Sequence, residues 1–171
     1  MSHRRPLPAI FATALLVILP MTSALAEEGP GHQAFEALKG LAGTWHGTAS
    51  ADQSNATHVF EVSAAGTVVM ETMFPDTDHE MINMYHLDGD DLVLTHYCAG
   101  GNQPTMKMTK SEGQTLHFDF TGGSNLNPET DPHIHAAKLT LGEGKLESHW
   151  IAWSEGKEAG VNEISLERAS D

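Results

Sequence analysis

The chain has 171 residues, with 23 acidic residues against nine lysines and arginines, a formal net charge of −14 and one cysteine. This charge excludes nucleic-acid binding and docking on an anionic membrane, because both need basic surfaces. A single cysteine excludes an intramolecular disulfide, and the length suits one domain with one core.

The first segment has the pattern of a secretion signal. A positive head at residues 3–5 precedes an apolar run, "AIFATALLVIL", and the small residues "ALA" at 24–26 form a cleavage site. The run is shorter than the ~20 apolar residues that cross a bilayer. We therefore expect a signal peptide at 1–26, a mature domain at 27–171 with no membrane span, and a periplasmic or secreted location.

One short helix and about ten strands are predicted after the signal. The stretch "HQAFEALKGLAG", residues 32–43, places Phe35, Leu38 and Leu41 on one helical face and ends in glycines. Short alternating runs then recur between turn-forming clusters, a pattern typical of antiparallel strands. The predicted strands are 44–51, 57–64, 67–74, 81–87, 91–98, 105–110, 115–121, 133–141, 145–153 and 160–168.

This order of elements predicts an all-β fold. The hairpin-length turns favour a single up-and-down antiparallel β-barrel with a short N-terminal helix, and a two-sheet sandwich is the alternative. One connection, "GGSNLNPETDP" at 122–132, is long, and long loops often form lids or rims.

The ends of the chain resemble calycins, the group that includes lipocalins and fatty-acid-binding proteins. "LKGLAGTWHGTA" is similar to the helix that leads into Gly-x-Trp on the first strand of those barrels. The resemblance implies that Trp45 closes the barrel base and that Arg168, in "ISLERA", packs over it. Ten strands with short turns look closer to fatty-acid-binding proteins and nitrobindin-like barrels. The latter bind haem through a His on the last strand, and "GVNEISLERA" has none, so haem is not expected.

Alternation places several histidines inside the predicted barrel. In "LVLTHYC", His96 and Cys98 share a face with leucines. In "HIHAAKLTL", Lys138 belongs in water, so His133 and His135 should point inward. The middle pattern "HEM…YH…THYC…GNQP" also resembles a group of secreted bacterial proteins.

Three further strands contribute to the same predicted interior. In "MINMYHL", the face that carries Met84 and His86 has no small polar residue, and we assign it to the inside. In "TMKMT", Met106 and Met108 lie opposite a lysine and should also face inward. Glu71 is a carboxylate in an apolar strand, and its burial would require a partner or a raised pKa.

The two His-containing pairs suit a transition metal. His133-x-His135 aims two imidazoles to one side of a strand, and His96-x-Cys98 repeats the spacing. Zinc accepts His and Cys tetrahedrally, and copper accepts two His, one Cys and a Met. The alternative is a hydrogen-bonded polar cluster that orients an organic ligand.

Two amides, Asn102 and Gln103, follow a Gly-Gly turn before Pro104. Turn chemistry explains most of this segment. As functional groups, the amides would recognise a polar part of a ligand at the barrel mouth.

These observations predict an exported barrel that binds a small molecule inside. The contacts would be direct or through zinc or copper held by His96, Cys98, His133 and His135. No Ser-His-Asp signature and no phosphate-binding glycine loop appears. An enzyme that uses the same cluster, either a metal-dependent or a His/Glu acid–base hydrolase or isomerase, is one alternative. A structural or interaction module with a filled core is the other. The oligomeric state stays open. The predicted ligand-binding residues are Glu71, His86, His96, Cys98, Asn102, Gln103, His133 and His135.

Overall fold

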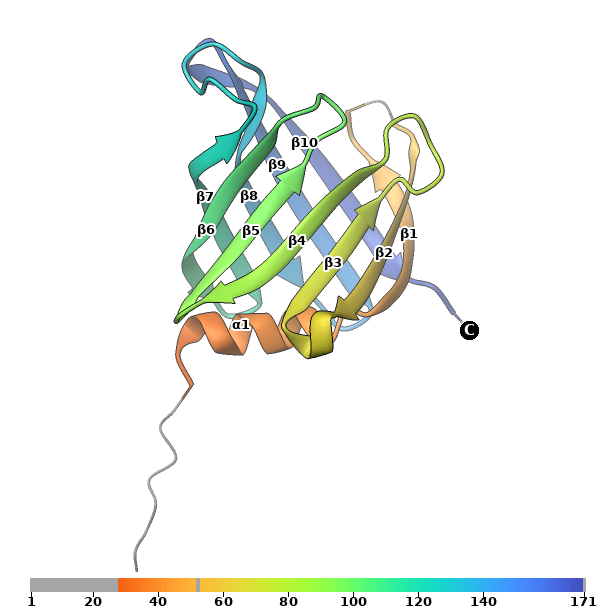
Figure 1. Ribbon diagram of the computed structural model, residues 1–171. Helices are drawn as coiled ribbons and strands as arrows, with labels where there is room; N and C mark the ends of the chain where they lie inside the picture. Colours follow the sequence, from red (N-terminus) through yellow and green to blue (C-terminus); the bar gives the residue numbers. More distant parts are fainter. Residues whose placement is uncertain (1–27, 52, 171) are drawn as a thin grey trace, which may run out of the picture.

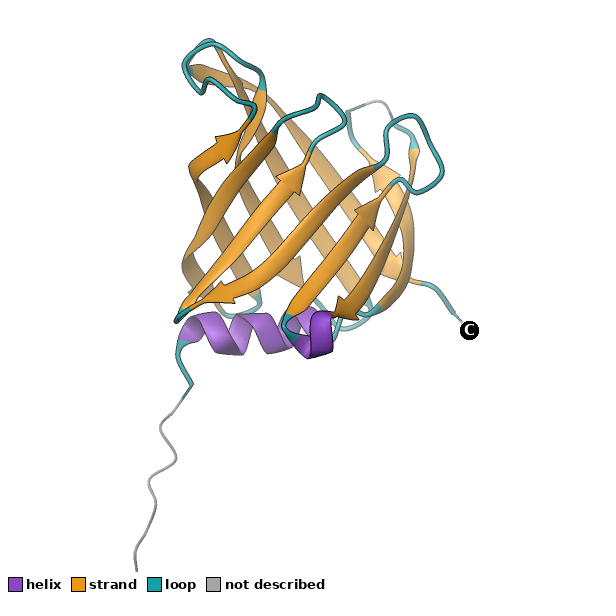
Figure 2. Ribbon diagram, in the orientation of Figure 1, coloured by secondary structure: helices purple, strands orange, loops and turns teal. Residues whose placement is uncertain are grey.

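Ten antiparallel strands close into one barrel, and a helix lies across its lower end (Figure 1, Figure 2). The computed structural model describes residues 28–51 and 53–170, so the predicted signal peptide lies outside the described residues. The elements are α1 (Pro30–Lys39), β1 (Gly43–Ala49), β2 (Asn55–Ser63), the short 3-10 helix η1 (Ala64–Gly66), β3 (Val68–Met73), β4 (Met81–Asp88), β5 (Asp91–Tyr97), β6 (Gln103–Glu112), β7 (Thr115–Ser124), β8 (His133–Leu141), β9 (Lys145–Ser154) and β10 (Lys157–Arg168).

Every strand pairs with its neighbours in sequence, and β1 also pairs with β10 to close the barrel. This confirms the predicted all-β up-and-down barrel and rules out the two-sheet sandwich. The C-terminal end of α1 comes earlier in the chain than that of the predicted helix at 32–43. It ends at Lys39, after which the N–H groups of Leu41 and Ala42 bond the carbonyls three residues back, a tighter turn than the α-helix.

Trp45 and Arg168 fasten the lower end of the barrel. Trp45 is buried, and its indole Nε1 donates a hydrogen bond to the Leu41 carbonyl at 2.7 Å. The Arg168 guanidinium lies 4.4 Å from the Trp45 ring and donates to the carbonyls of Gly40 and Ala42. This is the contact that the calycin resemblance implies, and it joins the end of the helix to the first and last strands.

The interior changes in character along the barrel axis. Near α1 it is apolar, and each large side chain buried there stabilises the fold by about 1.5–3 kcal/mol. Further from α1, four polar or charged side chains are buried on adjacent strands β2 to β5. The lower apolar set includes Leu38, Trp45, Leu92, Leu116, Leu139, Leu146 and Leu166, and the polar set is His58, Glu71, Asn83 and His96.

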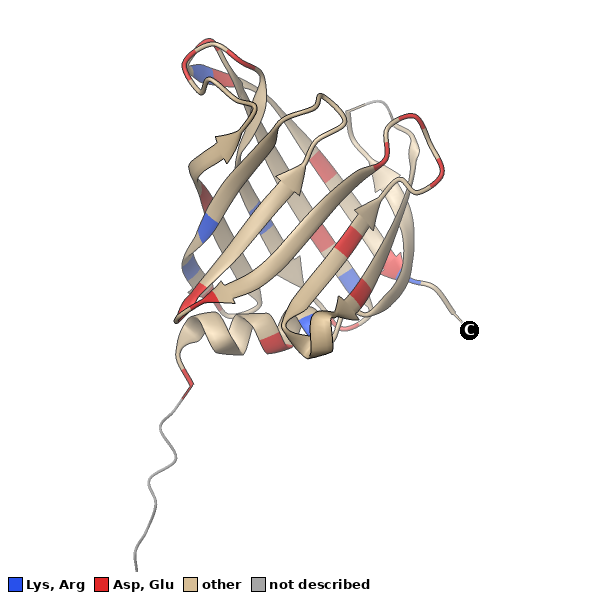
Figure 3. Cartoon of the chain, in the orientation of Figure 1, with Lys and Arg blue, Asp and Glu red and all other residues tan. Residues whose placement is uncertain are grey.

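Charged side chains are dispersed over the strands and loops (Figure 3). Lys107 lies on the outer face of β6, as alternation predicts, and its Nζ contacts Asp91 at 2.8 Å. Within residues 28–51 and 53–170, no helix has the length and hydrophobicity needed to cross a membrane.

Candidate functional site

The buried face of β4 is the opposite of the one predicted. Asn83 and Tyr85 are fully buried, whereas Met84 and His86 are only partly buried and lie on the outer face. The prediction that Met84 and His86 point inward is therefore wrong. It assumed an apolar interior, but the neighbouring strand buries Glu71, and a buried carboxylate needs donors that only the Asn83 and Tyr85 face supplies.

Three polar residues lie side by side across three strands. Glu71 on β3 is opposite Asn83 on β4, and Asn83 is opposite His96 on β5. Directly opposed residues have Cβ atoms only about 4.5–5.5 Å apart, so their side chains meet. On β2, Phe60 is opposite Glu71, which puts His58 two residues further toward the open end. The inward prediction for His96 and the need of Glu71 for a partner are both confirmed.

These residues form one hydrogen-bonded network, which we call the polar cluster: His58, Glu71, Asn83, Tyr85 and His96. His58 Nδ1 lies 2.6 Å from Glu71 Oε1. Glu71 Oε2 accepts hydrogen bonds from Asn83 Nδ2 at 2.8 Å and from the Tyr85 hydroxyl at 2.7 Å. Asn83 Oδ1 lies 2.7 Å from His96 Nδ1. The carboxylate of Glu71 is the centre of the network.

The surroundings of Glu71 favour its ionised form. Burial raises the pKa of its carboxyl, but the hydrogen bond and the positive charge of His58, with the hydrogen bonds from Tyr85 and Asn83, lower it further. The net pKa therefore lies below the usual value. Burial and the negative charge of Glu71 raise the pKa of Tyr85 well above its ordinary value, so its hydroxyl remains a donor.

An ionised Glu71 sets the direction of every hydrogen bond beyond it. A carboxylate only accepts, so Asn83 must turn its NH₂ toward Glu71 and its carbonyl oxygen toward His96. The His96 Nδ1 then carries the hydrogen and donates it. Burial lowers the pKa of His96 to about 4, with the charge of Glu71 acting in the opposite direction. Above that pH the ring is neutral, and its Nε2 has a free lone pair.

Two ring nitrogens of the cluster lack a partner. Among buried side-chain nitrogen and oxygen atoms of the described residues, His58 Nε2, His96 Nε2 and Asn102 Oδ1 make no hydrogen bond. An unsatisfied buried polar atom costs about 1–3 kcal/mol. His58 and His96 are 0% and 2% exposed, so bulk water does not compensate them. The polar cluster therefore leaves two buried nitrogens, His58 Nε2 and His96 Nε2, without a hydrogen-bond partner.

Aromatic rings flank both imidazoles. The His96 ring lies 5.6 Å from that of Trp150, which comes from β9 on another part of the barrel wall. The His58 ring meets Phe74 edge-on at 5.4 Å. The histidines therefore sit between apolar surfaces, where hydrogen bonds are stronger than in water.

A pocket of about 390 Å³ opens above the cluster, at the end of the barrel away from α1. Met73 and Met81 are opposite each other on β3 and β4, and His58 is opposite Met73, so this layer lies one step nearer the opening than Glu71. Phe74 lines the pocket and also contacts His58. We call this the mouth pocket: it is lined by Ala49, Ala51, Ser54, Asn55, Phe74, Thr77, His79, Met81 and Asn162.

Phe74 has an unusual backbone. Its φ is 51°, in the left-handed region that non-glycine residues rarely adopt, and its N–H donates to the Thr57 carbonyl at 2.8 Å. For a bulky residue this conformation costs about 1–3 kcal/mol and is found mainly where the surrounding structure requires it. The strained backbone holds the ring of Phe74 between the mouth pocket and His58.

Cys98 was predicted on the interior wall, and Asn102 and Gln103 at the rim. All three bond mainly within the loops at this end of the barrel. Cys98 is half-buried after β5, and its Sγ accepts from the Gly100 N–H at 3.4 Å. Asn102 Nδ2 donates to the Pro132 carbonyl, and Gln103 bonds Gly101 and Asn125. The structure uses both amides to join the loops at the rim.

His133 and His135 belong to a separate group at the rim. A β-bulge between Ile134 and Ala136 interrupts the alternation of β8, but His133 is buried, as its inward prediction requires. His135 stacks on Trp153 at 3.8 Å and on Phe120 at 5.0 Å.

The two rings also bond each other, since His133 Nε2 lies 3.0 Å from His135 Nδ1. Burial and the charge of His133 lower the pKa of His135, while Asp119 raises it. The structure does not bring the four predicted metal ligands together. Within residues 28–51 and 53–170, no three His, Cys, Asp or Glu side chains are placed to hold a metal ion.

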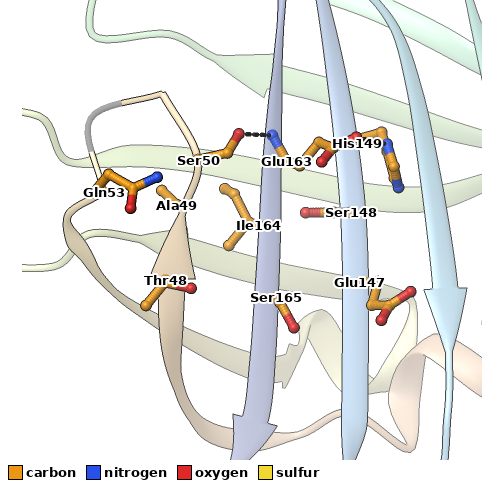
Figure 4. Close-up of a pocket in the computed structure, with 10 residues that line it drawn as sticks. All are labelled: Thr48, Ala49, Ser50, Gln53, Glu147, Ser148, His149, Glu163, Ile164 and Ser165. Atoms are coloured by element: carbon orange, nitrogen blue, oxygen red, sulfur yellow. Dashed lines mark hydrogen bonds and ion pairs between the residues drawn. The ribbon is translucent and has the colours of Figure 1, made fainter.

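A second hollow, of about 440 Å³, lies over β1, β9 and β10 (Figure 4). Thr48 and Ser165 alternate with the buried Ala49 and Ile164, so this groove is on the outer wall. Within it His149 Nδ1 pairs with Glu163 Oε1 at 3.1 Å. Because its main charged groups already pair with each other, we place the candidate site inside the barrel.

Sequence analysis missed His58, Asn83 and Tyr85. Two signals were available. His58 shares a strand face with Phe60, and Glu71 in an apolar strand required donors on the strands beside it. Of the eight predicted site residues, the structure brings only Glu71 and His96 into the polar cluster.

Comparisons with known proteins show the fold alone. No protein-family model matches the chain, and no curated protein matches it. Among solved structures, the chain is similar to the crystal structure of Rv2717c from M. tuberculosis, with 18% sequence identity and a TM-score of 0.53. The similarity covers 80% of this chain and 98% of that one.

Proposed function

We propose that the protein is an exported binding protein for a small molecule, which it takes from the mouth pocket into contact with the polar cluster. The observation that carries the proposal is the pair of buried ring nitrogens, His58 Nε2 and His96 Nε2, that have no partner. A ligand that satisfies them recovers the free energy that their burial costs. The apparent signal peptide supports a periplasmic or secreted location.

The surroundings of the cluster suit a ligand site. Such sites are mostly apolar concave regions with a few polar groups that orient the ligand. Here the mouth pocket has apolar walls at Phe74 and Met81. Glu71 and Asn83 lie one layer below Met73 and Met81, and His58 is in register with Met73. Methionine side chains are flexible and adapt to varied shapes, so this layer can yield to an entering molecule.

This geometry supports direct contact between the ligand and the histidine rather than contact through a bound zinc or copper ion. His96 belongs to the polar cluster, whereas His133 and His135 are engaged with Trp153 and Phe120 at the rim. Metal analysis of the native protein separates the two versions. We expect no stoichiometric zinc or copper; a stoichiometric metal that is lost on replacing His96 would restore the metal-mediated version.

The test is native mass spectrometry of the protein isolated from the compartment to which it is exported. We expect a non-covalent small molecule on the wild type, loss of it in His96→Ala, and retention in His86→Ala. His86 is a matched control because it is an outward histidine on the strand next to β5. A protein that carries no small molecule, or equal loss in both variants, contradicts the proposal.

An acid–base enzyme is the second candidate, and the contact between His58 and Glu71 favours it. A carboxylate 2.6 Å from Nδ1 orients the imidazole and leaves Nε2 free to take or give a proton. The test is to incubate the bound molecule with the protein and follow its conversion. A product that forms with the wild type and not with His58→Gln would establish catalysis, whereas an unchanged ligand supports binding alone.

A further inference from the structure

The polar cluster has a fixed hydrogen-bond direction that limits what can bind it. Ionised Glu71 orients the Asn83 amide, the Asn83 carbonyl holds the hydrogen of His96 on Nδ1, and a lone pair is left on Nε2. The atom that meets His96 Nε2 must therefore bring a hydrogen. A carboxylate oxygen cannot, because it only accepts.

The second nitrogen without a partner, His58 Nε2, is also compatible with a ligand that donates a hydrogen. His58 Nδ1 faces the Glu71 carboxylate and carries a hydrogen, so Nε2 accepts when the ring is neutral and donates when the ring is protonated. A hydroxyl group suits either state, because it both donates and accepts.

The charge and surface of the site argue for an uncharged ligand. The chain has a net charge of −14, which disfavours an anionic ligand. A cation would have to lose its hydration behind an apolar layer, where Glu71 is already engaged by three neighbours. Trp150 beside His96 and Phe74 beside His58 offer aromatic surface to the body of a ligand.

We propose that the ligand of the polar cluster is an uncharged, largely apolar molecule that donates a hydroxyl or N–H hydrogen to His96 Nε2, with phenols and apolar alcohols as the best-fitting class. This inference rests on the proposed binding function and adds the chemical class of the ligand. The mouth pocket supplies its path, past Phe74 and Met81.

Four probes with the same ring test this class. Phenol donates a hydrogen, anisole has the same oxygen without it, benzoate is an anion and benzylammonium is a cation. Binding is followed by the ¹⁵N chemical shift of His96 Nε2, which moves when that nitrogen accepts a hydrogen bond. We expect phenol to bind about tenfold more tightly than anisole, the ratio that one hydrogen bond provides. Benzoate and benzylammonium should bind more weakly than either.

Two variants separate the inference from the proposed function. His96→Phe should reduce the ratio between phenol and anisole binding, because the acceptor on His96 is gone while the apolar surroundings stay. His86→Phe should preserve the wild-type ratio. If none of the four probes binds the wild type, the binding function itself fails.

If the probes bind but anisole, benzoate or benzylammonium equals phenol, the binding function stands and the proposed ligand class is wrong. The free protein gives an independent check. A ¹⁵N spectrum with the hydrogen of His96 on Nε2 rather than Nδ1 would overturn the inference without any ligand.

Discussion

Replacing Glu71 by leucine should be among the most damaging single substitutions in the protein. The carboxylate accepts hydrogen bonds from His58, Asn83 and Tyr85, all of them buried. Leucine accepts none, so three donors lose their acceptor inside the barrel. The substitution thus removes the centre of the polar cluster rather than one contact at its edge.

The magnitude follows from those three donors. Each buried donor without an acceptor costs about 1–3 kcal/mol, and burial of the leucine side chain returns about 2 kcal/mol. Three such donors minus that gain give a net loss of about 1–7 kcal/mol of unfolding free energy, with the upper end reduced because neighbouring effects do not add fully. Domains of this size have about 5–15 kcal/mol in total. Glu71→Gln keeps one acceptor oxygen and loses the charged contact with His58, so it should cost only about 1–3 kcal/mol.

The assay is urea unfolding followed by tryptophan fluorescence at neutral pH. Glu61→Leu is the control, because Glu61 is exposed on β2 and should change stability by no more than about 0.5 kcal/mol. Buried ion pairs can sometimes be replaced by apolar residues without loss when both partners are removed. Here only one partner is replaced. A Glu71→Leu protein as stable as the wild type would refute the view that the network depends on its carboxylate.

Three further predictions concern other parts of the barrel. His96 has a pKa of about 4 in the folded protein against an ordinary 6.5, so the unfolded chain binds more protons between these two pH values. Acidification from pH 6.5 to 4 should therefore remove about 3 kcal/mol of unfolding free energy. His96→Gln should flatten this loss in urea titrations repeated across that pH range. Gly47→Ala should destabilise by about 1–3 kcal/mol or more in the same assay, because its Cβ would lie 1.8 Å from the Ser165 carbonyl oxygen, whereas Gly160→Ala meets open space and should be close to neutral. Arg168→Met should lower the melting temperature and make Trp45 more accessible to acrylamide quenching, because it removes the guanidinium over the indole; unchanged quenching would contradict a role in closing the base.

The barrel could be predicted because its signals are local. Period-two alternation and frequent hairpin turns specify antiparallel neighbours one pair at a time. Once consecutive strands are paired, the pairing of β1 with β10 that closes the barrel is the one strand pairing left to predict. That closure was implied by Trp45 and Arg168 at the two ends of the chain. The structure shows these residues in direct register, in contact at the lower end.

The candidate site was harder to predict because its determinants are not local. The inward face of β4 depends on what β3 buries: Asn83 and Tyr85 turn in to serve Glu71, although alternation within β4 is equally compatible with the opposite assignment. In β8 a single bulge between Ile134 and Ala136 separates the two histidines from the interior cluster. No turn residue marks the bulge in the sequence. Alternation still places His133 in a buried position, but it does not show that its ring bonds that of His135 rather than meeting His96.

The position of the polar cluster bears on the choice between a binding protein and a structural module. The lower interior shows that this sequence can fill a barrel with leucines, which is the more stabilising solution. Beside the mouth pocket it instead buries Glu71 with three hydrogen-bond partners and leaves two ring nitrogens unsatisfied. A module selected for stability alone has no use for that cost. The cost falls on the side of the barrel where the mouth pocket lies, and the proposed ligand would offset it.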